Sequence, residues 1–208
     1  MGEFMNSTKL KHILIIPVLV AAFLIETFLG TTFVSVLPFL PLLAYIIKSI
    51  AFYAALFVCF LLILKPNYTT KSIIKLICIV ATFWVFERIV AVFFFSEIFT
   101  LVYQIIRPLL IFAVVLLANI LVLNSKIYIN KLLLSVLCVL FVLGAVFNIL
   151  EYIRIITEIQ NMRNDFFSVL SLLRPLNSVY EILAKFCTYA FTFVLLIHSK
   201  CFKDTITN

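Results

Sequence analysis

Charged residues are scarce in this sequence, and their scarcity excludes an ordinary soluble domain. Of the 208 residues, 12% are charged and 65% are hydrophobic, whereas in soluble domains about a quarter are charged and about half are apolar. The mean hydropathy is +1.27. A chain of this composition has to place most of its side chains against lipid or against one another. We therefore predict an integral membrane protein.

Glycine and histidine are also rare. The three glycines form no G-x-x-x-G pattern for close helix crossings, and His12 and His198 lie near the two ends. The five cysteines stand singly, without a C-x-x-C pair, and we interpret them as small buried hydrophobic residues. They are Cys59, Cys78, Cys138, Cys187 and Cys201. The sequence thus predicts no metal, no cofactor and no catalytic residue, and it favours a protein that is not an enzyme.

Long apolar runs are what the sequence has in abundance. Each run approaches or reaches the roughly 20 residues that cross the hydrocarbon core, and none shows the alternation of a barrel strand. We predict an all-α, polytopic membrane helical bundle with six transmembrane helices. The runs are 13–29, 46–64, 73–95, 109–123, 132–150 and 183–197. Residues 1–4 resemble an expression-tag remnant, and residues 5–208 are expected to form a single six-helix transmembrane domain.

The lysines between these runs predict the orientation of the bundle. Lysines precede the first run, lie between the second and third and between the fourth and fifth, and follow the sixth. Because positive charge accumulates on the cytoplasmic side, both termini are predicted to be cytoplasmic, in a cell (inner or plasma) membrane. The net charge of +7 is spread over these connections. Membrane lipids are therefore expected partners, and nucleic acid is not.

Two of the connections predicted on the outer side are rich in apolar residues, and more than one structure is possible for each. The connection at 31–43 contains Pro38 and Pro41, and it can form a lid, a re-entrant segment or an ordinary turn at the interface. In the connection at 157–177, Asp165 can cap a short apolar helix that ends before Pro175. We expect this helix to lie in the interface or to fold over the outer mouth.

A layer of charged residues recurs at one depth. The depth of each charge in the membrane follows from its distance in residues to the flanking lysines, at 1.5 Å per residue. By this measure every predicted helix has a charge in the outer half of a hydrocarbon core about 30 Å thick. In the second helix this charge is Lys48. Deep charges are costly, ~2.5 to 3.5 kcal/mol or more, so they are expected to face inward and to pair. The candidate ligand-binding residues are Glu26, Glu87, Arg88, Arg107, Asn148, Glu151, Arg154, Glu181 and Lys185.

Spacing predicts some of the partners within this layer. Glu181 precedes Lys185 by four residues, the favourable order for an ion pair on one helix face. Glu87 and Arg88 point about 100° apart and are expected to have different partners. The shallower Arg107, Arg154 and Glu181 can instead be interfacial anchors. The whole set is consistent either with a structural ion-pair network or with an outward-facing polar pocket.

Three functions fit these predictions. We favour binding or transport of a small polar or zwitterionic solute from the outer side; six helices, inner termini and an outer site resemble the layout of the substrate-binding subunits of energy-coupling-factor transporters. One alternative is a non-catalytic membrane partner or immunity-type protein with a structural ion-pair network. The other is an enzyme that acts on a lipid-linked phosphate headgroup, with Arg88, Arg107 and Arg154 as anion clamps. Scarce glycine with abundant Ile, Phe and Lys is typical of an AT-rich bacterial genome.

Overall fold

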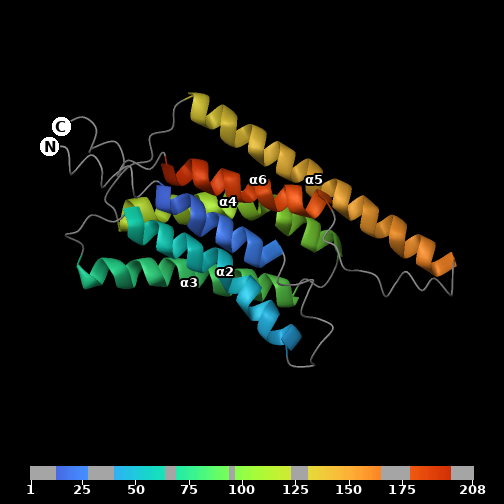
Figure 1. Cartoon of the computed structure of the whole chain (residues 1–208), viewed down its shortest axis with the longest axis horizontal. Coiled ribbons are helices and arrows are strands. Elements are labelled where there is room, and N and C mark those ends of the chain that lie inside the picture. The colour runs from blue at the N-terminus through green and yellow to red at the C-terminus, as the bar shows by residue number, and fades with distance from the viewer. Residues whose placement is uncertain are drawn as a thin grey trace.

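The structure is a computed structural model that describes residues 13–27, 40–63, 69–93, 97–122, 131–164 and 179–197. Successive helices run in opposite directions along one bundle, so that every second helix begins at the same end (Figure 1). Within these residues the predicted all-α class is confirmed, and the six helices that they form agree with the predicted number. The helices are an N-terminal helix at Ile13–Thr27, α2 at Leu40–Ile63, α3 at Thr70–Phe93, α4 at Glu97–Leu121, α5 at Lys131–Asn164 and α6 at Val179–Ile197.

Several helices are suited to a membrane in length and surface. Three segments are long and apolar enough to cross a bilayer, and two are apolar but shorter. The outer surface carries large apolar side chains, among them Val139 and Phe186, each 57% exposed. Such a surface is unfavourable in water and favourable in lipid. The long segments are Ile98–Leu121, Lys131–Thr157 and Val179–Ile197, and the shorter ones are Ile13–Thr27 and Ile50–Ile63.

The core lies between the helices and is built mainly from aliphatic and aromatic side chains. Phe52, Leu56 and Phe60 of α2 are almost fully buried, and they pack in one cluster with Ile111 of α4 and Leu195 of α6. Neighbours in sequence are also neighbours in space, because α2 contacts α3, α3 contacts α4, and α5 contacts α4 and α6. Asn119, Thr188 and Thr192 are buried in the core, and each donates a hydrogen bond to a main-chain oxygen of its own helix.

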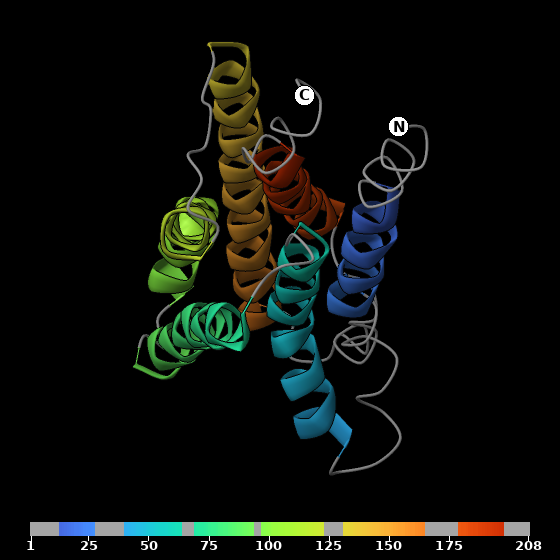
Figure 2. The ribbon, with the colours of Figure 1, turned by 90° about the vertical axis from the view of Figure 1, so that its left-hand side faces the viewer.

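The longest helix, α5, is inclined to α3 and α4, which Figure 2 shows nearly end-on. It makes its most extensive contact with α6. At this crossing a Cβ atom added to Gly144 would lie 3.3 Å from Cβ of Cys187. The missing side chain of Gly144 therefore allows the two helices to approach closely. One glycine is sufficient here, although no G-x-x-x-G pattern exists.

Two predicted boundaries are wrong. The fourth predicted helix begins at residue 109, but α4 begins at Glu97, so Pro108 lies inside the helix. Polar residues before Pro108 interrupt the apolar run, yet Thr100, Gln104 and Arg107 belong to the same helix. Similarly, α5 continues to Asn164, which makes residues 157–164 helical. The stretches 28–39 and 165–178, with most of the proposed lid and the short helix after Asp165, lie outside the described residues.

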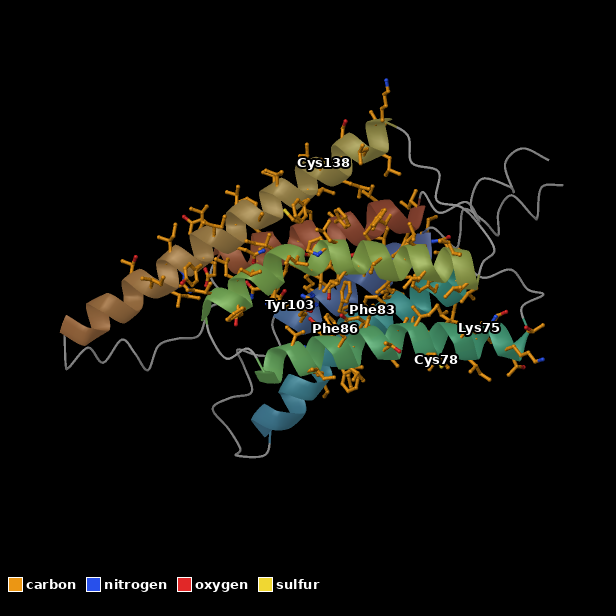
Figure 3. All side chains as sticks on the ribbon, turned by 180° about the vertical axis from the view of Figure 1, so that it is seen from behind. Lys75, Cys78, Phe83, Phe86, Tyr103 and Cys138 are labelled. Atoms are coloured by element: carbon orange, nitrogen blue, oxygen red, sulfur yellow. The ribbon has the colours of Figure 1, made fainter. Side chains whose placement is uncertain are left out.

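The cysteines divide between core and surface. Cys59 and Cys187 are buried as predicted, whereas Cys78 and Cys138 are exposed, so the prediction is wrong for these two. Figure 3 labels them on α3 and α5. A thiol is weakly polar, and a surface that faces lipid accepts it as readily as a core does. Cys201 lies outside the described residues.

Candidate functional site

Glu26, near the end of the N-terminal helix, is the centre of a buried ion-pair network. The residue is only 7% exposed. Its Oε1 accepts a hydrogen bond of 2.9 Å from Nη1 of Arg107, and its Oε2 accepts one of 2.7 Å from the hydroxyl of Tyr189. Charged hydrogen bonds of this kind are the strong ones, and in a low-dielectric interior water does not compete for them. Glu26 thus joins the N-terminal helix to α4 and α6.

Arg107 extends the network to a second carboxylate. Its Nε lies 3.4 Å from Oε1 of Glu87 on α3, and its guanidinium lies 5.0 Å from the centre of the Phe52 ring. The Arg107 side chain is 16% exposed, so the interpretation as an interfacial anchor is wrong. Arg88 lies 3.8 Å from Glu87. The two neighbours therefore contact each other, which the prediction of separate partners did not anticipate.

Aromatic side chains enclose this network, and the sequence analysis did not single them out. Tyr189 packs edge to face against Phe52 and Phe23, with ring centres 5.2 and 5.6 Å apart. The phenol groups of Tyr53 and Tyr103 lie beside the Glu87 carboxylate. Figure 3 labels Tyr103 on α4, in the half of the bundle opposite to Lys75. The signal that could have identified Tyr189 is its position four residues after Lys185, on the same face of α6.

Lys185 connects this network to a second polar region. Its Nζ donates a hydrogen bond of 2.6 Å to Oε1 of Glu181, which confirms the predicted pair. The same Nζ lies 3.5 Å from the main-chain oxygen of Glu26. The side chain of Lys185 is 13% exposed and that of Glu181 is 32% exposed. Lys185 is therefore the inner member of the pair, and Glu181 is the accessible one.

The second region is a cleft of about 320 Å³ between α4, α5 and α6, which we call the polar cleft. Two carboxylates, Glu151 and Glu181, line it together with two amide side chains. Glu151 accepts two hydrogen bonds from Arg154, at 2.7 and 3.0 Å. Asn148 donates one of 2.9 Å to the main-chain oxygen of Gly144. The lining residues are Thr100, Leu101, Gln104, Asn148, Glu151, Tyr152, Ile155 and Glu181.

The nine candidate residues consequently fall into two groups that Lys185 connects. The buried network contains Glu26, Glu87, Arg88 and Arg107. The polar cleft contains Asn148, Glu151 and Glu181. Arg154 and Lys185 hold the two cleft carboxylates without belonging to the lining. Lys48 lies in α2, and its side chain is outside the described part of the structure.

This pairing bears on the anion-clamp prediction. Arg107 binds two carboxylates, Arg154 binds Glu151 through two nitrogens, and Arg88 lies beside Glu87. A phosphate would have to compete with a carboxylate for each guanidinium. Among the described residues, no cluster of three or more His, Cys, Asp or Glu side chains is placed to hold a metal ion.

The apolar helices, the lipid-compatible surface and the internal charges define a multi-pass α-helical membrane protein. No protein-family model matches the sequence, and neither the curated proteins nor the solved structures contain a match. The function therefore has to be inferred from the chain's own residues.

Proposed function

We propose that the chain crosses the membrane six times with both ends in the cytoplasm, and that it binds a small polar or zwitterionic solute in the polar cleft. The solute enters from the outer side, and the protein acts as a binding or transport component. The observation that carries the proposal is a cleft of about 320 Å³, lined mostly by polar side chains, within a bundle of apolar helices.

The orientation is supported by the distribution of lysine. The exposed residues Lys71, Lys75 and Lys131 stand at or near the starts of α3 and α5, which lie at the same end of the bundle (Figure 1). Positive charge of this kind favours the cytoplasmic side. The cleft residues Thr100 and Glu181 stand near the starts of α4 and α6, at the opposite end. The cleft is therefore proposed to open toward the outside.

The solute class is supported by the size and chemistry of the cleft. A volume of about 320 Å³ is at the lower end of the range for ligand sites, roughly 300 to 1,000 Å³. Carboxylate, amide and hydroxyl groups of the lining can bind an amine and neutral polar groups. Polar residues inside a membrane protein are costly, and a binding function is the usual reason for them.

The proposal is tested by mass spectrometry of what co-purifies with the protein in a mild detergent. A small polar molecule should be found with the wild type and lost from the Glu151→Gln variant. Thr82→Val is the matched control, because Thr82 is exposed on α3 and its hydroxyl bonds only its own helix, at Cys78. Retention of the same molecule by Glu151→Gln, or its absence from a folded wild type, contradicts the proposal.

A second candidate is a membrane partner protein without a small ligand. It is favoured by one observation, the buried and internally paired set of Glu26, Arg107 and Glu87, which joins three helices to one another. Under this alternative no solute co-purifies with any variant. A detergent-stable complex with another membrane protein should then be recovered by crosslinking in intact cells.

A further inference from the structure

The two carboxylates of the polar cleft, Glu151 and Glu181, differ in how firmly their cations hold them. Glu151 is held by two hydrogen bonds from Arg154, and its side chain is 11% exposed. Glu181 is held by one hydrogen bond from Lys185, and its side chain is 32% exposed. A lysine ammonium is a point charge on a flexible stem, whereas a two-bond arginine contact is rigid. Glu181 and Lys185 are therefore the pair that can exchange partners.

For the side chains that the structure describes, the charges around the cleft and the network cancel. Among the described side chains of this half of the bundle there are four carboxylates and four cations: Glu26, Glu87, Glu151, Glu181, Arg88, Arg107, Arg154 and Lys185. A monovalent cation or anion that entered would leave one uncompensated charge in a low-dielectric interior. A solute with one positive and one negative group leaves the balance unchanged.

Taking the proposed function as its basis, we infer that the solute is a zwitterion that inserts into the Glu181–Lys185 pair. Its ammonium group replaces Lys185 at Glu181, and its anionic group binds the released ammonium of Lys185. The two side chains stand four residues apart on α6, and residues at this spacing have Cβ atoms about 5 to 6 Å apart. The charged ends lie 2.6 Å apart when paired, and the flexible lysine stem lets them separate far enough to admit the two charged groups of a short amino acid.

The position of Lys185 favours this exchange. Its Nζ already lies 3.5 Å from the main-chain oxygen of Glu26, so the ammonium keeps a polar neighbour while it moves from Glu181 to the ligand. The Glu26 carboxylate already accepts hydrogen bonds from Arg107 and Tyr189, so it competes less strongly for Lys185 than an anion that has no other partner. The anionic group of the solute can therefore attract the released ammonium of Lys185.

The experiment compares a zwitterion with two compounds of the same carbon chain length, one that has only the ammonium group and one that has only the carboxylate. Binding of 4-aminobutanoate, n-butylamine and butanoate to the purified full chain is measured by isothermal calorimetry, and glycine and 6-aminohexanoate extend the range of charge separation. At least one zwitterion should bind, and the single-charge compounds should bind about tenfold or more weakly, since each lacks one charged contact. Equal affinity for n-butylamine, or no binding of any zwitterion, overturns the inference.

Variants assign the binding to the pair. Glu181→Gln and Lys185→Gln should each lose about tenfold or more in affinity for the zwitterion. Both variants should still elute as a single monodisperse peak on size-exclusion chromatography, which separates a loss of binding from a folding defect. Unchanged zwitterion affinity in Lys185→Gln overturns the inference. A co-purified solute that depends on Glu151 but carries a single charge also overturns it, while leaving the proposed function intact.

Discussion

The hydroxyl of Tyr189 donates a 2.7 Å hydrogen bond to the carboxylate of Glu26, and this contact joins the first described helix to the last. The two residues are 163 positions apart in the chain, and both are almost fully buried. The second oxygen of Glu26 is bound by Arg107. The carboxylate therefore connects three helices, and a loss at any one of its partners should be detected as a loss of stability.

Removing only the Tyr189 hydroxyl should lower the free energy of unfolding. Hydrogen bonds to charged groups contribute about 1.5 to 3 kcal/mol, and the Tyr189→Phe variant keeps the ring that packs on Phe52. Thermal unfolding in detergent measures the change. Tyr180→Phe, at a residue 39% exposed on the same helix, provides the comparison. Equal melting of the two variants would show that the bond to Glu26 contributes little.

Arg107 should be the most sensitive position of the buried network. Replacing it by Gln leaves Glu26 and Glu87 facing each other without their shared cation, and breaking a buried pair costs about 3 to 5 kcal/mol. The Arg107→Lys variant should recover only part of the loss, because a lysine cannot contact two carboxylates through a planar fork. Thermal unfolding and monodispersity on size-exclusion chromatography are the measurements.

Arg154 gives the matched control for that experiment. It too binds a carboxylate, but its side chain is 36% exposed, against 16% for Arg107. Its partner Glu151 is buried, with a side chain 11% exposed, so the pair is open to solvent only on the arginine side. Exposed pairs contribute less than buried ones. The Arg154→Gln variant should therefore lose less stability than Arg107→Gln, and a larger loss at Arg154 than at Arg107 would contradict the division between network and cleft.

The sequence predicts the helices well because the positions of long apolar runs determine which segments can lie in lipid. It also predicts the Glu181–Lys185 pair, since that pair depends only on the helical spacing of one segment. It could not predict that Arg107 binds Glu26 and Glu87, because these partners come from three helices whose rotations are set by packing. Residue counts give only the depth of Arg107 in the membrane, and a side chain at that depth can be either an anchor at the surface or a buried ion-pair partner.

The approach of α5 to α6 can be tested with a disulfide. A Cβ atom at position 144 would lie 3.3 Å from Cβ of Cys187, a few tenths of an ångström inside the usual range for disulfides, about 3.5 to 4.5 Å. The Gly144→Cys variant should therefore form an intramolecular bond with Cys187 under mild oxidation. Cleavage within residues 165–178 followed by non-reducing electrophoresis detects it. The bond should vanish when Cys187 is replaced by Ala, and free thiols at both positions would indicate a different crossing.

Glu87→Gln separates a structural role of the buried network from a binding role. Glu87 contacts Arg107 and Arg88 and does not line the polar cleft. Its neutralisation weakens the hold on Arg107 while a neutral oxygen remains, so we expect a loss of about 1 to 3 kcal/mol in stability. Retention of the co-purified solute should be unchanged, whereas Glu151→Gln should release the solute with little loss of stability, because its partner Arg154 can be solvated. If Glu87→Gln instead releases the solute from a protein that melts like the wild type, the ligand contacts the network, and the binding site extends from the cleft to Glu87.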